Sequence, residues 1–215
     1  MATLPNIEAF PTHWNQLNDV RADHRIDTNK NHNCGPESIA ECLMYLTNVE
    51  LPAGYIADVI LGPDKVNVDT WNTQLADFIR NWSHIDVDDS NRGDSGAAIR
   101  YAIDQGYPII VLFYWDLAAV DRGDMANAGG HWCPVIAYDD HSVTRSNPWG
   151  GVKETWDWGQ FNKYKQNNVY VILKRRRAID AGDRGLLDPF VQLVQKAAEE
   201  AQKMGYHRMS NQPAG

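Results

Sequence analysis

The stretch PIIVLFYW, residues 108–115, decides the fold class. It is a short, continuous apolar run rich in β-branched residues, which is typical of a buried strand. Before it, apolar residues recur at helical spacing, and after it they form further short runs of the strand type. Helices followed by an antiparallel sheet indicate an α+β fold.

The region upstream of residue 108 predicts helices over 36–49, 52–61, 70–82 and 95–105. Pro36 suits the first turn of a helix, where its missing N–H costs nothing, and Gly106 suits a C-cap. Trp71 is expected on the apolar face of the third helix, beside Leu75, Phe78, Ile79 and Trp82. Residues 1–33 are polar and are expected to be irregular.

Downstream, strands are predicted over 131–138, 142–145 and 168–174, with a turn at Asp139-Asp140. The basic run 174–177 precedes a link rich in Gly and Asp, and 186–204 has the pattern of an amphipathic helix. Its apolar face is expected to contain Leu187, Phe190, Val191, Val194 and Ala198. We therefore expect one domain over 1–177 and a linker with a C-terminal helical extension over 178–215.

Charge and hydropathy exclude several classes of protein. Lys+Arg total 20 against Asp+Glu 28, a net charge of −8, so a broad nucleic-acid footprint is not expected. No run of apolar residues is long enough to span a membrane. Residues 1–14 lack the basic and apolar regions of a signal peptide. Synthesis in the cytoplasm is expected, with a separate system releasing the protein if it acts on the cell wall.

The chain has three cysteines, Cys34, Cys42 and Cys133. Because the number is odd and no two are spaced as CxxC, the sequence indicates neither a disulfide framework nor a zinc knuckle. Cys34 lies directly before the strongest predicted helix, in NHNCGPES (31–38). The unpaired N–H groups and dipole of a helix start favour a thiolate by about 0.3–1 kcal/mol, so full activation needs a partner such as a histidine. Asn33 is the candidate N-cap. Cys34 is therefore a candidate nucleophile, and a small apolar core cysteine is the alternative.

His131 follows two glycines at the start of a predicted strand, where a substrate chain can approach the bare backbone. Asn147 comes after a strand, a turn and a second strand, the arrangement of a hairpin that returns beside its own start. Its amide oxygen is therefore a candidate to accept from the imidazole and fix its tautomer. A buried structural histidine and an ordinary Asn-Pro turn are the alternatives.

Together these residues resemble the C39-like branch of the papain-fold cysteine peptidases. NCGPES (33–38) resembles the nucleophile motif, GGHWCPVIAYD (129–139) the histidine strand, and NPWGG (147–151) the turn of the third residue. WDWGQF (156–161) is similar to a later stretch of that group, and the likeness spans about residues 14–174. The resemblance implies a papain-like fold with the nucleophile at a helix start.

The resemblance also implies roles: Cys34 as nucleophile, His131 as general base and then acid, and Asn147 as the residue that orients the ring. It implies an amide oxyanion donor upstream of the cysteine, for which Gln16 is the candidate, with Asn29 and Asn31 nearer in sequence. Two departures are that many relatives carry Asp where this chain has Asn147, and that the papain-type CG[SA]C[WY] signature is absent. No metal or organic cofactor is implied.

The sequence favours neither of two possible metal sites. A zinc site would need His131, Cys133 and Cys34 as ligands, and their spacing matches no standard zinc motif. The acidic residues Asp86, Asp88, Asp89, Asn91 and Asp94 do not have the spacing of a calcium loop. A solvated acidic loop is the expectation, with the basic run 174–177 paired to the acidic body.

The function expected is that of a cysteine peptidase or amidase acting through an acyl-enzyme on peptides, with a phage or bacterial cell-wall lysin as one form of it. An acyltransferase with the same triad and a non-catalytic binding module on this fold are the alternatives. Peptide or peptidoglycan peptide is the expected partner. The pattern leaves the scissile bond, the oligomeric state and the role of the C-terminal helix open.

Overall fold

The apolar run that decides the fold class forms β4 (Ile109–Tyr114), an interior strand of a mixed sheet-and-helix structure. The computed structural model describes residues 1–20, 29–63, 67–83, 86–89, 94–176 and 188–208. Ile109, Ile110 and Val111 are at most 1% exposed, because β4 has a neighbouring strand on each side and is covered by helices. The α+β expectation is confirmed.

Within the described residues the main sheet has seven strands and is antiparallel at every pairing. Its order is β3 (Val87–Asp88), β8 (Lys165–Leu173), β4, β5 (Gly130–Tyr138), β6 (Ser142–Asn147) and β7 (Val152–Asp157). The short β1 (Ala2–Thr3) pairs with the end of β5. The β5–β6 hairpin returns the chain beside its start, with Val135 opposite Arg145.

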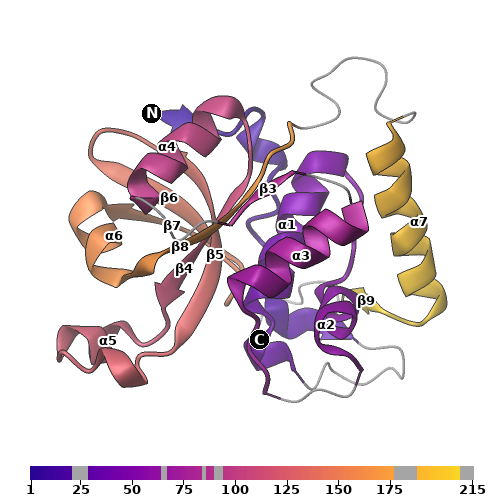
Figure 1. Cartoon of the computed structure of the whole chain (residues 1–215), viewed down its shortest axis with the longest axis horizontal. Helices are drawn as coiled ribbons and strands as arrows, with labels where there is room; N and C mark the ends of the chain where they lie inside the picture. Colours follow the sequence, from indigo (N-terminus) through magenta and orange to yellow (C-terminus); the bar gives the residue numbers. More distant parts are fainter. Residues whose placement is uncertain (21–28, 64–66, 84–85, 90–93, 177–187, 209–215) are drawn as a thin grey trace, which may run out of the picture.

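Helices cover both faces of this sheet, as Figure 1 shows. On one side lie α1 (Cys34–Thr47), α2 (Ala53–Leu61) and α3 (Asn72–Ser83), with α7 (Pro189–Lys203) outermost. On the other side lie α4 (Ser95–Gln105) and α6 (Trp158–Tyr164), with α5 (Leu117–Asp121) at the end of β4. The connecting segments contain the 3-10 turns η1 (Ile7–Ala9), η2 (Gln16–Asn18), η3 (Lys30–His32) and η4 (Met125–Asn127).

The helix α1 is the centre of the core. Ile39, Leu43 and Leu46 are fully buried, as is Cys42, because α1 packs against β5 on one side and against α2 and α7 on the others. Burying such side chains contributes roughly 1.5–3 kcal/mol each. The packing holds the first residue of α1, Cys34, at a fixed place beside β5.

Several local expectations are corrected. Trp71 is 68% exposed, because α3 begins at Asn72 and Trp71 precedes it. Asn33 occupies the N-cap position of α1 but its side chain makes no cap hydrogen bond; its Oδ1 accepts from Asn29 Nδ2 at 2.9 Å instead. Residues 1–20 contain short elements where irregular chain was expected. The strand β7 and helix α6 were not predicted, because β7 alternates between exposed and half-buried positions with no apolar run.

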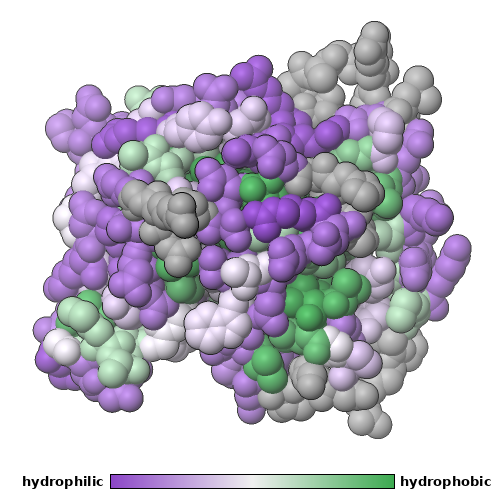
Figure 2. Space-filling view, viewed as in Figure 1, coloured by the Kyte–Doolittle hydropathy of each residue, from purple (hydrophilic) through white to green (hydrophobic). Residues whose placement is uncertain are grey.

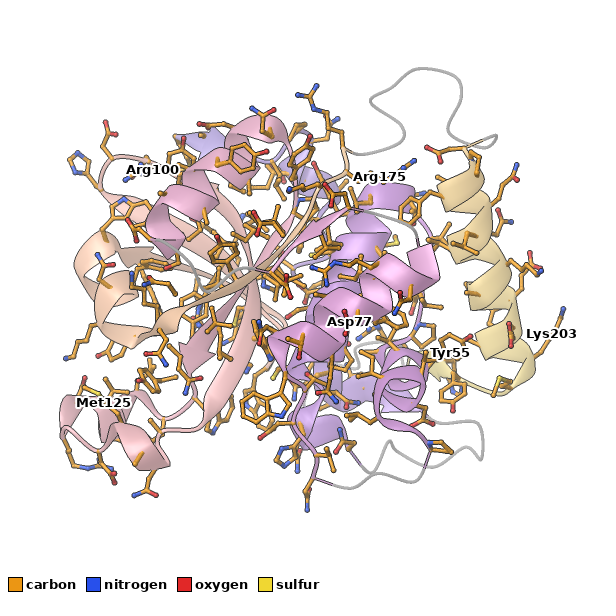
Figure 3. All side chains as sticks on the ribbon, in the orientation of Figure 1. Tyr55, Asp77, Arg100, Met125, Arg175 and Lys203 are labelled. Atoms are coloured by element: carbon orange, nitrogen blue, oxygen red, sulfur yellow. The ribbon has the colours of Figure 1, made fainter. Side chains whose placement is uncertain are left out.

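The C-terminal helix α7 packs against α1 and α3. Its buried residues include four of those expected on its apolar face, Phe190, Val191, Val194 and Ala198; Leu187 lies outside the described residues. Arg175 forms an ion pair with Asp188 at the start of α7, and Tyr55 meets Tyr206 edge-on after its end. Figure 3 labels Arg175 and Tyr55 at these two ends. The strand β9 (His207–Arg208) then pairs with β2 (Asp19–Val20).

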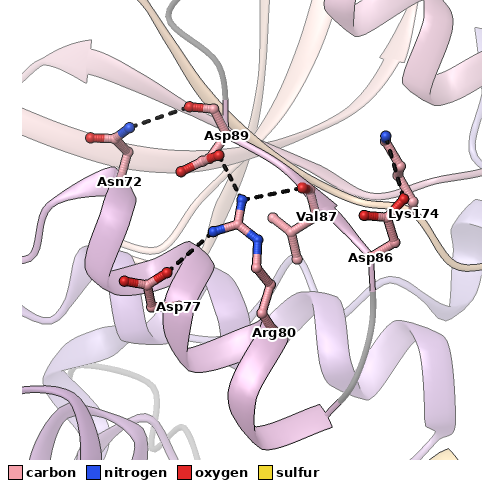
Figure 4. Close-up of polar contacts among 7 residues, drawn as sticks. All are labelled: Asn72, Asp77, Arg80, Asp86, Val87, Asp89 and Lys174. Carbon is pink, nitrogen blue, oxygen red and sulfur yellow. Dashed lines mark hydrogen bonds and ion pairs between the residues drawn. The ribbon is translucent and has the colours of Figure 1, made fainter.

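The acidic segment before α4 is neutralised by basic side chains (Figure 4). Arg80 of α3 pairs with Asp77 at 3.2 Å and Asp89 at 2.7 Å, and also donates to Val87 O. Lys174, from the basic run, pairs with Asp86 at 3.5 Å. Asp94 caps α4 by accepting from Gly96 N, while Asn91 lies outside the described residues. These partners give Asp86, Asp89 and Asp94 a structural role.

One face of the molecule carries a hydrophobic patch over α2 and α3, visible in Figure 2. It contains Val59, Ile60 and Phe78, which line a shallow groove between the two helices. The rest of that face is mostly hydrophilic. Among the described residues, no helix combines the length and the hydropathy that crossing a membrane requires.

Candidate active site

Cys34 begins α1 and touches the strand β5 closely. A Cβ on the next residue, Gly35, would lie 2.2 Å from Thr70 Oγ1 and 3.2 Å from Trp132 Cδ1, so only glycine permits this approach. Trp132 is held by its Nε1, which donates to Thr70 O at 3.0 Å, and by its own carbonyl, which accepts from Ser38 Oγ at 3.1 Å. The start of α1 is thereby clamped to β5 next to His131.

Burial controls the ionisation of the Cys34 thiol, since only 7% of the residue is exposed. It raises the pKa to about 11, although the backbone N–H of Trp132 lowers it and the charge of Asp69 raises it further. The N–H groups of Gly35 and Cys34 itself also favour the thiolate. The thiol is therefore protonated at neutral pH, and the helix-start effect expected from the sequence is outweighed by desolvation. The backbone N–H that faces the sulfur belongs to Trp132, the residue that follows His131 in β5.

His131 and Asn147 meet across the β5–β6 hairpin. His131 Nε2 lies 2.8 Å from Asn147 Oδ1, and the same oxygen accepts from Trp149 N at 3.0 Å. An amide oxygen can only accept, so Nε2 is the nitrogen that bears the proton. The lone pair of the neutral ring is then on Nδ1.

A charged pair stands behind Asn147. Asn147 Nδ2 donates to Glu154 Oε1 at 2.8 Å, and the other carboxylate oxygen of Glu154 accepts from Arg145 Nε at 2.9 Å and from its terminal NH2 group at 2.6 Å. Arg145 is buried and stacks over the rings of Trp156 at 3.7 Å and Phe113 at 4.8 Å. The chain of contacts therefore runs from His131 through Asn147 and Glu154 to Arg145.

Two tryptophans pack beside the His131–Asn147 pair. Trp115 lies edge-on to the His131 ring with centroids 5.0 Å apart, and edge-on to Trp149 at 4.6 Å. His131 is only 4% exposed. Burial lowers its pKa from 6.5 to about 4, with the hydrogen bond to Asn147 acting in the opposite direction. The imidazole is thus neutral at physiological pH and able to accept a proton.

This burial predicts a pH dependence of stability. The pKa of His131 is about 4 in the folded state and near 6.5 when unfolded. The neutral, buried imidazole therefore contributes on the order of 3 kcal/mol to the free energy of unfolding. This contribution is complete above pH 6.5 and is lost as the pH falls toward 4. Urea unfolding of the wild type and His131→Gln at pH 7 and pH 4 measures the difference. The exposed His141→Gln is the control, and equal acid sensitivity of all three proteins would refute the assignment.

Gln16 lies beside the Asn147 turn. It is 1% exposed, and its backbone N–H donates to Pro148 O at 3.0 Å. Its 3-10 turn, η2, also packs against η3, which leads into Cys34. The two alternatives are placed differently. Asn29 uses its amide on Val68 N and O and on Asn33, and Asn31 is exposed. The backbone of Gln16 therefore lies between the Asn147 turn and the segment that leads into Cys34.

Gly151 holds the segment before Gln16 against this turn. A Cβ there would lie 2.5 Å from the backbone oxygen of His13, and its φ is +63°. We predict that Gly151→Ala costs about 2–4 kcal/mol, combining left-handed strain and overpacking. Gly150 has φ +85° with nothing within 4 Å of its Cβ position, so Gly150→Ala carries the strain alone, about 1–2 kcal/mol. Urea unfolding compares the two, and equal losses would contradict the close contact.

A cavity of about 450 Å³ opens at Cys34. One wall comes from the loop before α3, with Asp69, Thr70 and Trp71, and the other from β4, β5 and β8. Gly129, Gly130 and Trp132 line it directly before and after His131. Met125, labelled in Figure 3 in the segment that follows α5, also lines it. The space is large enough for several residues of an extended chain.

The described residues give no geometric support for a zinc site at His131, Cys133 and Cys34. Cys133 is fully buried, and its sulfur accepts from an Arg145 guanidinium N–H at 3.5 Å. Burial also raises the pKa of its thiol far above the usual value. In the part of the chain that the structure describes, no three His, Cys, Asp or Glu side chains gather as a metal site would require.

The sequence interpretation missed Glu154 and Arg145. Both lie on neighbouring edge-side strands, β6 and β7, paired directly opposite each other. The pattern VKETW (152–156) shows no apolar run, so β7 and its carboxylate were not identified. One feature of the sequence does indicate a strand here: charged residues alternate with Thr and Trp directly after the NPWGG turn.

Comparison with known proteins agrees with this architecture. No family model and no curated protein sequence matches the chain. Among solved structures it is similar to the crystal structure of a candidate C39-like peptidase from Bacillus anthracis, with a TM-score of 0.60 and 14% sequence identity. The match covers 82% of this chain and 98% of that one. At this identity the likeness concerns the fold, which is the α+β arrangement of a papain-like peptidase.

Proposed function

We propose that this chain, which has the fold of a C39-like peptidase, is a cysteine peptidase or amidase that uses Cys34, His131 and Asn147. The observation that carries the proposal is the 2.8 Å contact between His131 Nε2 and Asn147 Oδ1, one residue from the Trp132 N–H that faces the Cys34 sulfur. A nucleophile, a base and a group that orients the base are the parts that covalent acyl transfer needs.

In this proposal the reaction begins from a neutral pair. His131 Nδ1 takes the proton as the Cys34 sulfur attacks the amide carbon, and the imidazolium formed gives that proton to the leaving amine. The Cys34 N–H and the Gln16 amide bind the tetrahedral oxyanion, and such a donor is worth about 2.7–4 kcal/mol. Water, activated by His131, then releases the acyl group from sulfur.

The cavity supports an extended peptide as substrate. Its walls offer apolar surface from Leu112, Trp132 and Val169, and polar groups from Thr70, Asn72 and Gln166. Bare backbone at Gly129 and Gly130 next to His131 gives a strand-like substrate room to lie along β5. We propose peptidoglycan peptide as one substrate of this kind, in a phage or bacterial lysin that a separate system releases to the cell wall.

The experiment is to incubate the full chain with purified cell-wall peptides and, separately, with a general peptide library, and to identify products by mass spectrometry. Cleavage in either set supports the hydrolase, and cleavage of the cell-wall set alone supports the lysin. Cleavage of the library alone overturns the lysin but keeps the peptidase. Absence of product from both sets overturns the peptidase.

The same chemistry distinguishes hydrolysis from transfer. If an added amine captures the acyl group, its adduct appears in the same mass spectra at the expense of the acid product. A dominant adduct at millimolar amine identifies an acyltransferase, whereas a dominant acid product identifies a hydrolase. A binding module would give neither product.

A further inference from the structure

The contacts behind Asn147 determine which way its amide is turned. A carboxylate accepts hydrogen bonds and donates none, so the group that faces Glu154 Oε1 at 2.8 Å must be the Asn147 NH2. This places Oδ1 toward His131 and toward the Trp149 N–H. The orientation is therefore set by partners whose donor or acceptor character is fixed.

Arg145 in turn fixes Glu154. Two of its N–H groups bind one carboxylate oxygen, at 2.6 and 2.9 Å, which leaves the other oxygen for Asn147. The guanidinium lies over the Trp156 ring at 3.7 Å and over the Phe113 ring at 4.8 Å, and 7% of the Arg145 side chain is exposed, against 29% for Glu154. Such an ion pair with a stacked, buried arginine is a rigid support.

We propose that Glu154 is a positioning residue for catalysis: held by Arg145, it locks the Asn147 amide and thereby keeps the His131 proton on Nε2. The inference rests on the proposed function for its kinetic consequence. Neither Glu154 nor Arg145 touches the substrate or the sulfur in this role. Glu154 acts by orienting the Asn147 amide, which keeps the His131 proton on Nε2. Nδ1 is then free to accept the thiol proton.

The consequences of Glu154→Gln follow from hydrogen-bond complementarity. Arg145 retains the amide oxygen of the new side chain, so its NH2 faces Asn147. The Asn147 NH2 then faces another NH2, a donor against a donor. Turning the Asn147 amide removes this clash at the cost of the Trp149 N–H bond, and it places the Asn147 NH2 toward His131, which favours the Nδ1–H tautomer. We expect kcat to fall at least about 10-fold with KM little changed.

Asn147→Asp supplies the reciprocal test. A carboxylate at 147 faces the carboxylate of Glu154 with no proton between them, so this variant alone is also impaired. In the double variant Asn147→Asp/Glu154→Gln, the Gln NH2 donates to the Asp, whose other oxygen accepts from His131 Nε2–H. We therefore expect the double variant to exceed both single variants in kcat, whereas independent effects multiply into a lower one.

The tautomer is measured without turnover. Imidazole ¹⁵N chemical shifts of His131 distinguish Nε2–H from Nδ1–H in the full chain, and the exposed Glu199→Gln is the matched control. We expect Nε2–H in the wild type and in the control, and a shift toward Nδ1–H in Glu154→Gln. Glu154→Asp keeps the charge but withdraws the carboxylate by one methylene group. If the Gln variant is unstable, this variant tests whether the carboxylate must reach Asn147 to hold the tautomer.

The outcomes separate the two proposals. A wild type that cleaves no peptide but shows the Glu154-dependent tautomer overturns the function and retains the positioning role. An active enzyme whose His131 tautomer is unchanged in Glu154→Gln and Glu154→Asp overturns the positioning role. Further loss of kcat in the double variant, by the product of the single effects, overturns it as well.

Discussion

Cys34→Ala abolishes peptide hydrolysis through an acyl-enzyme, because the variant lacks the proposed nucleophile. Loss of a nucleophile in a comparable triad costs on the order of 10⁶ in kcat. The fold is expected to persist, since alanine removes only a sulfur atom at the edge of the core. Initial rates on the substrate found by mass spectrometry, together with urea unfolding, measure both effects.

Cys42→Ala is the matched control. Cys42 lies on the same helix, is fully buried and takes no part in the proposed chemistry. It is expected to lose about 1–2 kcal/mol of stability as a core truncation while keeping nearly full activity below its unfolding transition. Undiminished activity of Cys34→Ala would falsify the assignment, and loss of activity in both variants would show that the first result reflects packing.

Thiol labelling gives an independent reading. Cys34 is 7% exposed, whereas Cys42 and Cys133 are fully buried, so iodoacetamide should modify Cys34 first in the native protein. With the Cys34 pKa raised to about 11 by burial, the rate should still be rising at pH 9. A plateau below pH 8 would mean that the thiolate already exists in the free enzyme as a pair with His131.

The elements with continuous apolar patterns could be predicted from the sequence. The strands β4 and β5 and the helix α1 lie within a few residues of the predicted ranges. The same patterns placed Cys34 at a helix start and put Asn147 at the return of a hairpin that begins at His131. Local periodicity determines these features because each is fixed by burial of one segment against the core.

The rest depends on contacts between distant segments. Gln16 is placed by Pro148 O and by the lack of a side chain at Gly151, and no pattern in residues 1–20 reveals either contact. Glu154 was missed because an edge strand needs no apolar run. The ionisation of Cys34 also escaped prediction, since the helix-start effect is local whereas desolvation depends on the whole fold.

Arg208→Met is expected to destabilise the protein by about 3–5 kcal/mol, the cost of removing one partner from a buried ion pair. Arg208, in β9, lies 2.8 Å from a carboxylate oxygen of Glu37, which is fully buried one turn after Cys34. Burial raises the Glu37 pKa, and Arg208 is the main influence that lowers it. Arg208 also donates to Asn15 O and stacks over Trp14.

Two further variants show whether the pair itself carries the effect. Glu37→Met/Arg208→Met removes both charges, so it is expected to be more stable than Arg208→Met alone, because no uncompensated carboxylate remains. Lys163→Met breaks the exposed pair with Asp121, at 52% and 49% exposure, and should cost at most about 1 kcal/mol. Urea unfolding at pH 7 measures all three.

Urea unfolding of Arg208→Met also tests the domain boundary proposed at residue 177, between the main domain and the C-terminal extension. If the segment after it is a separable extension, Arg208→Met leaves the main urea transition in place. If Arg208 completes the core, the main transition shifts and the Cys34 thiol becomes more reactive. Glu37 lies one turn after Cys34 on α1, and the segment before Gln16 loses its contact with Arg208 in the variant. We expect the second result, since the Arg208 guanidinium joins α1 to residues 14 and 15 in one buried contact.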